Sequence, residues 1–318
     1  MNYSVGEKVA TRTAFGEALA QFGGRNKKVV VFDADLSGST KTEKFAKLYP
    51  DRHFNFGIAE ANMVTAAAGM ALRAKIPFAC SFAMFVTGRG WEYIRNSICY
   101  PNLNVKIVGT HAGILTGEDG ATHQALEDIA LMRSLPNMKI ICPADAAEMY
   151  LAMDEILKDF GPTYIRLGRG DVPVIYGPDH QFRIGFGDIL TYGEDISLIA
   201  TGTMVHICLE AAKMLEDHGL KVMVVNISTI KPIDEKLIVD CAQKTKMVVT
   251  AEDHNIIGGL GSAVSEVLTE HYPAKLHRIG MEDRFGESGK PADLYKKYGL
   301  DVQGVYERVL TWWENRSL

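Results

Sequence analysis

A lone carboxylate stands at the start of an apolar segment, because Glu60 follows a glycine turn in "FNFGIAEANMVTAAAGMALR". A partly desolvated carboxylate beside an apolar helix can donate or accept a proton near neutral pH. A glutamate in the first turn of a helix is also common, since the helix macrodipole stabilises it by about 0.3–1 kcal/mol. The local sequence leaves both interpretations open.

A glycine-rich segment carries a second group of reactive side chains. "HAGILTGEDGATHQ" contains His111, Asp119 and His123, and it follows an expected strand. The spacing does not fit a compact helical pair of metal ligands. Glycines let a backbone approach a ligand closely, and His and Asp can hydrogen-bond hydroxyls and move protons. We therefore expect a ligand-binding loop rather than a solvated loop with incidental histidines.

Aromatic and basic residues near other expected strand ends have two interpretations each. Phe82 and Phe85 in "SFAMF" are either core residues or a surface on which a planar ring stacks. Arg12 and Arg169, taken singly, are ordinary surface charges, and Ser39 is an ordinary helix cap.

Strand-like and helix-like segments alternate almost throughout the chain. Buried β-branched runs such as "KKVVVF", "IPFAC", "LNVKIVGT", "MKIICPAD" and "PTYIRL" end in polar turns. Helical patterns cover residues 86–98, 124–135 and 205–217, and a helix with a capping-box-like start follows Asp145, with Glu148 three residues on. This alternation predicts α/β domains whose parallel sheets are covered on both faces.

A change of pattern divides the chain. Residues 168–187, "GRGDVPVIYGPDHQFRIGFG", have no clear period, and strands resume after them. We predict two doubly wound domains, residues 1–170 and the smaller 188–318, joined by a linker over 171–187. Ligands of open parallel sheets bind at the carboxyl ends of the strands, which is where the reactive residues of the first domain fall.

Composition excludes several classes of protein. The 318 residues carry a net charge of −5, which does not favour nucleic acid or an anionic membrane as a partner. The sequence shows neither an apolar run of about 18 residues nor the apolar core of a secretion signal at its start. Five scattered cysteines are typical of reduced thiols in a cytoplasmic protein and argue against a zinc site.

Several motifs together resemble one family. "TRTAFGEAL", "DADLSGS", "FNFGIAEANMV", "THAGILTGEDGATHQALEDIALMRSLPNM" and "TAEDHNIIGGLG" are similar to the pyrimidine-binding and C-terminal domains of transketolase, with deoxyxylulose-phosphate synthase expected as the nearest relative. The resemblance covers most of the chain, and it implies an enzyme of the thiamine-diphosphate class.

The resemblance implies a role for each residue at the cofactor. Glu60 matches the glutamate that hydrogen-bonds N1′ of the thiamine pyrimidine and so promotes formation of the thiazolium ylid. Phe82 and Phe85 match aromatics that pack on the pyrimidine, while the family's further aromatic falls at Gly88. Asp35 matches an aspartate near the cofactor at the subunit interface.

The resemblance also implies a substrate site. Asp119, His111 and His123 match residues that orient sugar hydroxyls or move protons. A cluster that grips the sugar phosphate is matched by Arg12, Ser39, His111 and Arg169. Such a cluster suits a phosphate dianion, because charge-assisted and bidentate hydrogen bonds are strongest there.

A motif of the family is missing from the sequence. The GDG and Asn-Asn elements that hold the diphosphate through Mg²⁺ do not occur, so we expect no metal ligands in this chain. The resemblance then implies the C-terminal subunit of a split transketolase, active only with a separate N-terminal subunit in an α₂β₂ heterotetramer. Three alternatives stay open: a β subunit of a 2-oxoacid dehydrogenase E1 component, a transketolase for an unusual sugar phosphate, and a non-catalytic subunit.

Overall fold

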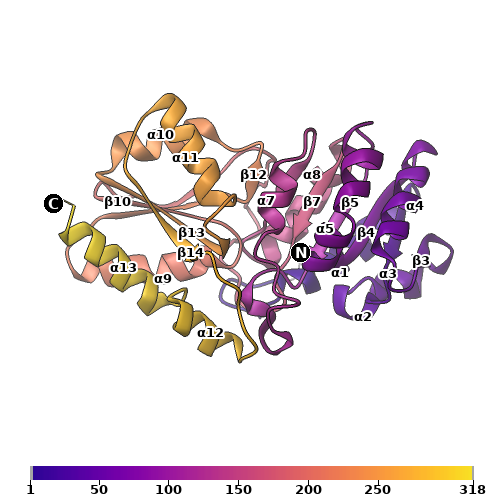
Figure 1. Cartoon of the computed structure of the whole chain (residues 1–318), viewed down its shortest axis with the longest axis horizontal. Coiled ribbons are helices and arrows are strands. Elements are labelled where there is room, and N and C mark those ends of the chain that lie inside the picture. Colours follow the sequence, from indigo (N-terminus) through magenta and orange to yellow (C-terminus); the bar gives the residue numbers. More distant parts are fainter. Residues whose placement is uncertain (1–2, 317–318) are drawn as a thin grey trace.

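The computed structural model describes residues 3–316, which form two α/β halves lying side by side (Figure 1). The half coloured indigo to magenta is built on a seven-stranded sheet, and the orange and yellow half on a five-stranded sheet. None of the described helices combines the length and the apolar character that crossing a membrane requires.

The larger sheet belongs mainly to the first half of the sequence. Its strands are β2 (Val29–Asp33), β3 (His53–Asn55), β4 (Ile76–Phe82), β5 (Lys106–Thr110), β6 (Lys139–Ile141), β7 (Thr163–Arg166) and β12 (Thr229–Lys231). They lie in the order β12-β6-β7-β5-β4-β2-β3, and all pairs are parallel except β12 with β6. One edge strand of this sheet is therefore supplied by the second half of the chain.

Helices cover both faces of the larger sheet. They are α1 (Thr11–Arg25), α2 (Ser37–Thr40), α3 (Glu43–Leu48), α4 (Glu60–Leu72), α5 (Ala83–Arg89), α6 (Trp91–Tyr93), α7 (Asp128–Arg133) and α8 (Ala146–Lys158). Phe15 of α1 and Met149 of α8 pack on one face, and Met63 of α4 and Val86 of α5 pack on the other. The strands are almost wholly apolar because both of their faces are buried.

The smaller sheet follows the same plan. Its strands are β9 (Asp188–Thr191), β10 (Ile196–Ala200), β11 (Val222–Asn226), β13 (Met247–Asn255) and β14 (Leu276–Met281), in the order β14-β13-β10-β11-β9. Only β9 pairs antiparallel in this sheet. The helices are α9 (Met204–Asp217), α10 (Glu235–Lys244), α11 (Leu260–His271), α12 (Pro291–Tyr298) and α13 (Val302–Glu314).

The two faces of the smaller sheet are also buried. Residues of α9, α12 and α13 pack on one face and extend the core formed by α1 and α8, while α10 and α11 cover the other face. A single apolar core therefore runs through both halves of the molecule. A two-stranded ribbon of β1 (Lys8–Val9) and β8 (Val172–Pro173) ties the start of the chain to the connecting segment.

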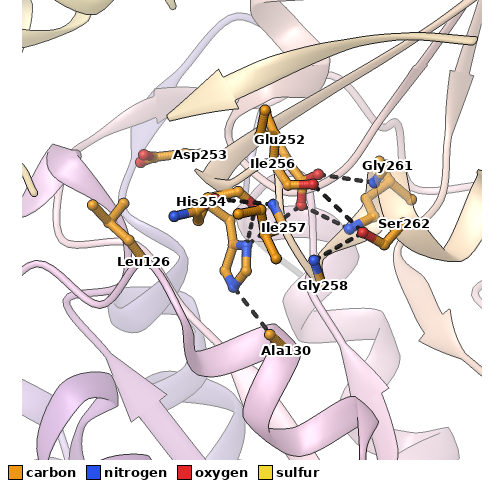
Figure 2. A network of polar contacts seen from close by, with 12 residues as sticks. Leu126, Ala130, Glu252, Asp253, His254, Ile256, Ile257, Gly258, Gly261 and Ser262 are labelled. Carbon is orange, nitrogen blue, oxygen red and sulfur yellow. Dashed lines mark hydrogen bonds and ion pairs between the residues drawn. The ribbon is translucent and has the colours of Figure 1, made fainter. Parts of the chain in front are cut away.

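Polar contacts at the junction of the halves gather around β13. Glu252 accepts a hydrogen bond from the backbone N–H of Leu260 at 2.7 Å and another from that of Gly261 at 2.8 Å, where α11 begins. The contact with Gly261 is drawn in Figure 2. His254 reaches α7 of the other half, with its Nε2 3.5 Å from the backbone nitrogen of Ala130. Burial raises the pKa of Glu252 to about 7 and lowers that of His254 to about 4.

A buried ion pair of the first half lies at the same junction, and one of its residues also bonds to the second half. Arg166 Nε lies 2.8 Å from Asp128 Oδ2, and Arg166 Nη2 donates to the backbone oxygen of Asp253 at 2.8 Å. The hydroxyl of Tyr164 donates to the same carboxylate of Asp128 at 2.6 Å. Although burial acts in the opposite direction, Arg166 holds the pKa of Asp128 below its usual range.

The predicted parallel sheets are confirmed, and two predicted helices were wrong in extent. The segment expected as one helix over 86–98 begins at Ala83, breaks after Arg89, and continues over Ile94–Cys99 as a π-helix. The helix expected over 124–135 covers only Asp128–Arg133, because the preceding residues form the end of the glycine-rich loop. The predicted start of α8 is confirmed, since Asp145 accepts the backbone N–H of Glu148 at 2.7 Å.

Candidate active site

The carboxyl ends of neighbouring parallel strands lie along one edge of the larger sheet. Phe82 at the end of β4 pairs with Thr110 at the end of β5, and Gly109 pairs with Arg166 of β7. The segments that follow these strands are therefore neighbours, and they carry most of the residues singled out in the sequence. Such an edge is the usual ligand-binding place of an open α/β sheet.

Glu60 is both a helix-start residue and a buried carboxylate. It is the first residue of α4, and it is only 2% exposed. Its Oε1 accepts a hydrogen bond from Ser81 Oγ of β4 at 3.4 Å. The carboxylate thus faces the sheet edge, although it begins a helix.

A cation lies between Glu60 and the aromatic pair. Arg89 Nη1, at the end of α5, lies 3.3 Å from Oε1 and 3.2 Å from Oε2 of Glu60. The Arg89 guanidinium also lies over the ring of Phe85, 4.3 Å from its centroid. Phe85 in turn stacks on Phe82, with centroids 5.5 Å apart and planes inclined by 24°.

His111 joins the aromatic pair to the basic residues. Its ring lies on Phe82 with a centroid distance of 3.8 Å, and its Nδ1 is 2.9 Å from Thr110 Oγ1. The side chain is buried, and burial, assisted by the charges of Arg12 and Arg169, lowers the pKa of His111 to about 3. The imidazole is therefore neutral at physiological pH and offers one donor and one acceptor nitrogen.

The four residues expected around a phosphate group lie together, but they contribute different atoms. Arg12 Nη1 donates to the backbone oxygen of Ser39 at 2.8 Å and lies 3.4 Å from His111 Nε2. Arg12 Nε donates to the backbone oxygen of Arg169 at 3.3 Å. Ser39, a residue of α2, is thus held in the cluster through its carbonyl.

Arg169 connects the cluster to the glycine-rich loop. Its Nη1 donates to the backbone oxygen of Thr116 and lies 3.6 Å from Asp119 Oδ2. His123 closes the loop against the aromatic pair, with its ring 5.1 Å from that of Phe85 in an edge-on arrangement.

The second half of the chain supports the glycine-rich loop. Asp253 Oδ1 of β13 accepts the backbone N–H of Ile114 at 2.9 Å. Gly113 adopts a φ of +78°, and a Cβ there would meet Asp253 Oδ2 at 2.0 Å, so only glycine fits. The glycines of this loop therefore allow a close approach to the other half of the molecule, in addition to any ligand.

Asp35 lies outside this chain of contacts. It is exposed after the end of β2, with a φ of +62°, and its Oδ1 accepts a hydrogen bond from Asn55 Nδ2 at 3.1 Å. With Arg89 added, the remaining candidates form a continuous path of contacts, which runs through Glu60, Arg89, Phe85, Phe82, His111, Arg12, Arg169 and Asp119. Ser39 adjoins this path at Arg12, and His123 adjoins it at Phe85.

Sequence reasoning missed Arg89 and Ser81 as partners of Glu60. Ser81 directly precedes Phe82, and Arg89 directly follows Gly88, the position where the expected third aromatic is absent. The missing aromatic was the available signal, because the planar group that lies over Phe85 in the structure is the guanidinium of Arg89.

Family models match two segments of the chain. Residues 7–174 match the pyrimidine-binding domain of transketolase, and residues 185–305 match the transketolase C-terminal domain.

Known relatives agree with these matches. A protein of Methanocaldococcus jannaschii named as a transketolase C-terminal section is 50% identical over 303 residues, covering 94% of this chain and 95% of the relative. The 6-deoxy-6-sulfo-D-fructose transketolase subunit SqwH of a Clostridium species is 39% identical over 294 residues, covering 92% and 91%. The transketolase of Rattus norvegicus is 37% identical, and the chain spans 50% of it.

One expectation about relatives was wrong. A 1-deoxy-D-xylulose-5-phosphate synthase of Caldanaerobacter subterraneus is 37% identical over 312 residues, which is below the 50% of the Methanocaldococcus protein.

Solved structures show the same architecture. A split gene transketolase, described as an inactive beta4 tetramer, superposes with a TM-score of 0.89 at 52% identity, covering 95% of this chain and 98% of that one. Transketolase from Campylobacter jejuni superposes with a TM-score of 0.82 at 27% identity, covering 96% of this chain and 47% of that one. The chain therefore belongs to the transketolase family, of which it carries the pyrimidine-binding and C-terminal domains.

Proposed function

We propose that this chain is the C-terminal subunit of a two-chain transketolase, which reversibly transfers a two-carbon ketol group from a ketose phosphate to an aldose phosphate. The observation that carries this proposal is the unbroken path of contacts from the buried carboxylate of Glu60, past Phe85 and Phe82, to the basic residues Arg12 and Arg169. It supports the proposal because a buried carboxylate, an aromatic surface and two guanidinium groups lie along one edge of the sheet.

The residues at one end of this path fit the thiamine-diphosphate cofactor on which the family depends. The guanidinium of Arg89 lies on Phe85 and against Glu60, so a planar group bearing N–H donors already fits between these two side chains. The pyrimidine of thiamine is also planar, so Phe82 and Phe85 would pack on its face. Glu60 would hold its ring nitrogen through a hydrogen bond in which one proton is shared between the carboxyl group and that nitrogen. When bound, thiamine diphosphate supplies a carbon nucleophile that carries the transferred ketol group.

The chain's own residues have separate tasks at the substrate. Arg12 and Arg169 provide two guanidinium groups for a sugar phosphate, where charge-assisted hydrogen bonds are strong. The neutral imidazole of His111 donates or accepts a hydrogen bond at a sugar hydroxyl without adding charge. Asp119 and His123, which lie on the same glycine-rich loop, orient the remaining hydroxyls and move protons between them and the site.

A second subunit completes this proposal. The GDG and Asn-Asn elements that would hold Mg²⁺ and the diphosphate are absent from the sequence, so a separate N-terminal subunit would supply them in an α₂β₂ assembly. The names of two similar proteins, a transketolase C-terminal section and a split gene transketolase, support this division.

Reconstitution tests the proposal directly. The full chain is mixed with the candidate N-terminal subunit, thiamine diphosphate and Mg²⁺, and ketol transfer between pentose phosphates is followed. We expect turnover from the mixture and none from either chain alone. Oxidation of pyruvate with an artificial electron acceptor, without ketol transfer, would instead identify a 2-oxoacid dehydrogenase subunit. Failure to activate any such partner would favour a non-catalytic subunit.

A sulfonated sugar is a second candidate substrate. The Clostridium relative is named as a subunit of a transketolase for 6-deoxy-6-sulfo-D-fructose. Two guanidinium groups and a neutral imidazole can bind either a sulfonate or a phosphate. The phosphate dianion gains more from the two positive charges, because it carries more negative charge. The ratio of kcat/KM for a phosphorylated and a sulfonated ketose in the reconstituted enzyme decides between them.

A further inference from the structure

Three potential metal ligands from three different elements converge beside the segment that connects the two halves. Glu148 comes from α8, His180 from the connecting segment, and Asp188 is the first residue of β9. One ligand atom of each lies within 4.8 Å of the others. None of the three belongs to the candidate active site.

The imidazole of His180 points between the two carboxylates without bonding to either. Its Nε2 lies 3.8 Å from Glu148 Oε1 and 3.9 Å from Asp188 Oδ2, beyond hydrogen-bonding distance. The side chain is 9% exposed, and Nε2 is buried without a hydrogen-bond partner among residues 3–316. A buried polar atom that bonds to nothing is costly, so its position calls for a ligand.

The surrounding groups hold these three side chains in place. The His180 ring stacks on Tyr176 with a centroid distance of 3.7 Å and an interplanar angle of 22°. Asn226 Nδ2 donates to Glu148 Oε1 at 3.0 Å, and the backbone N–H of Ala144 donates to Glu148 Oε2 at 2.7 Å. Metal ligands in proteins are characteristically oriented by such outer hydrogen bonds.

We propose that Glu148, His180 and Asp188 bind one divalent first-row cation of the zinc class. Bonds of about 2.0–2.2 Å to imidazole nitrogen and carboxylate oxygen place tetrahedral ligand atoms about 3.4 Å apart. The distances of 3.8 and 3.9 Å from His180 Nε2 to the two carboxylates exceed this by a few tenths of an ångström. The Tyr176 hydroxyl already donates a hydrogen bond to Asp188 Oδ2 at 3.1 Å, so a water molecule would fill the fourth position.

The donor set decides the class of cation. One imidazole and two carboxylates suit Zn²⁺ and its neighbours, whereas Mg²⁺ and Ca²⁺ prefer oxygen ligands alone. Glu148 is buried and Asp188 is 39% exposed, and the repulsion between two carboxylates this close is relieved when a cation lies between them. Of the three ligands, His180 also lines a pocket of about 590 Å³, together with residues of α1, α8 and the connecting segment.

A cation at this place would fasten the connecting segment to both halves. Its ligands belong to α8 of the first half, to the segment itself, and to the edge strand β9 of the smaller sheet. A ligand that binds only the folded state stabilises it by mass action, so the site predicts metal-dependent stability. The role is structural, and it does not depend on the proposed ketol transfer.

The experiment uses the full chain alone, without partner subunit, thiamine or substrate. After dialysis against a chelator, Zn²⁺ is titrated by calorimetry, and the Tm is measured with and without the metal. We expect one equivalent of Zn²⁺ to bind and to raise the Tm, and Mg²⁺ at the same concentration to leave it unchanged. His180→Ala should weaken Zn²⁺ binding by at least about tenfold, the loss that even an outer-shell change typically causes.

Two further variants make the result decisive. His271→Ala is the matched control, because His271 also faces a carboxylate, Glu235 at 3.5 Å, but lies on the surface with no third potential ligand among residues 3–316. Asp188→Asn replaces a ligand whose side chain is 39% exposed, so this variant should fold. Its Zn²⁺ affinity can therefore be measured even if His180→Ala fails to fold. Absence of saturable Zn²⁺ binding, or equal affinity in the parent, His180→Ala and Asp188→Asn proteins, overturns the proposal.

Discussion

The guanidinium of Arg89 contacts both carboxylate oxygens of Glu60, with Nη1 3.3 Å from Oε1 and 3.2 Å from Oε2. The carboxylate is buried, whereas the Arg89 side chain is 52% exposed. Arg89 also covers the face of Phe85, so one side chain joins the carboxylate to the aromatic surface. Both interpretations of Glu60 therefore hold. The residue begins a helix, and its buried carboxylate also faces a planar group, the guanidinium of Arg89.

Glu60→Gln is expected to reduce ketol transfer by the reconstituted enzyme by about 10²–10⁴-fold, the usual contribution of a positioned acid–base group. Glutamine keeps the size of the side chain but cannot take up or release the proton. The measurement is kcat with thiamine diphosphate, Mg²⁺ and the N-terminal subunit present in excess.

Glu43→Gln is the matched control for this variant. Glu43 is likewise the first residue of a helix, α3, and its side chain is 41% exposed. Both variants lose a negative charge in the first turn of a helix. We therefore expect Glu60→Gln to lose ketol-transfer activity and Glu43→Gln to keep it. Equal activity of Glu60→Gln and the parent would contradict the proposed proton role.

The contact between Arg89 and Glu60 should contribute to stability as a pair. Arg89→Ala is expected to lower the free energy of unfolding by about 0.5–1 kcal/mol, a modest value because the arginine is half exposed. In the Glu60→Gln background the same substitution should cost much less, since the charge that it compensates is gone. Urea unfolding of the four proteins of this double-mutant cycle measures the coupling. A purely additive cycle would show that the contact contributes nothing.

His111 should make the fold sensitive to acid. An unfolded histidine has a pKa of about 6.5, whereas burial and nearby cations lower the pKa of folded His111 to about 3. Between these values the unfolded chain binds a proton that the folded chain does not. Stability therefore falls as pH decreases below 6.5, by up to about 1.4 kcal/mol per pH unit.

His111→Asn isolates this contribution, because asparagine tolerates the φ of +58° at this position. Urea unfolding is measured at several pH values from 7 to 4, and the advantage of the parent over the variant should shrink as the pH falls. Parallel stability curves would be inconsistent with a neutral, buried His111.

Arg12→Ala should affect phosphorylated substrates selectively. Loss of charge-assisted hydrogen bonds, worth about 1.5–3 kcal/mol, predicts a rise in KM of about 10- to 100-fold for a ketose phosphate. A ketol donor without a phosphate should be affected far less, which provides the internal control. An equal loss with both donors would assign Arg12 to positioning of His111, from which it is 3.4 Å away.

Arg166→Ala should be strongly destabilising. It removes the cationic partner of the fully buried Asp128 and a hydrogen bond to the backbone of Asp253 across the junction of the two halves. Breaking a buried pair on one side typically costs about 3–5 kcal/mol. Lys158→Ala, which breaks an exposed pair with Asp154, should leave the urea midpoint unchanged. Equal effects of the two substitutions would contradict this assignment.

The short edge strands show where sequence patterns end. The strands β2, β4, β5 and β7 were predictable, because continuous β-branched runs bury both faces of a parallel sheet. The three-residue strand β12 was not, since it exists only by pairing with β6 from the other half of the chain. The short local sequence of β12 does not indicate that it pairs with β6.

What the sequence by itself determined was the residue types and their placement near strand ends: Glu60 at the start of an apolar helix, Phe82 and Phe85 around the end of β4, and His111 at the start of a glycine-rich loop. The tertiary structure alone decided that Arg89 pairs with Glu60 and that Glu148, His180 and Asp188 converge. The reason is physical. Periodicity and propensity report on interactions within a few residues, whereas these contacts form only when separate helices and strands pack around a shared core.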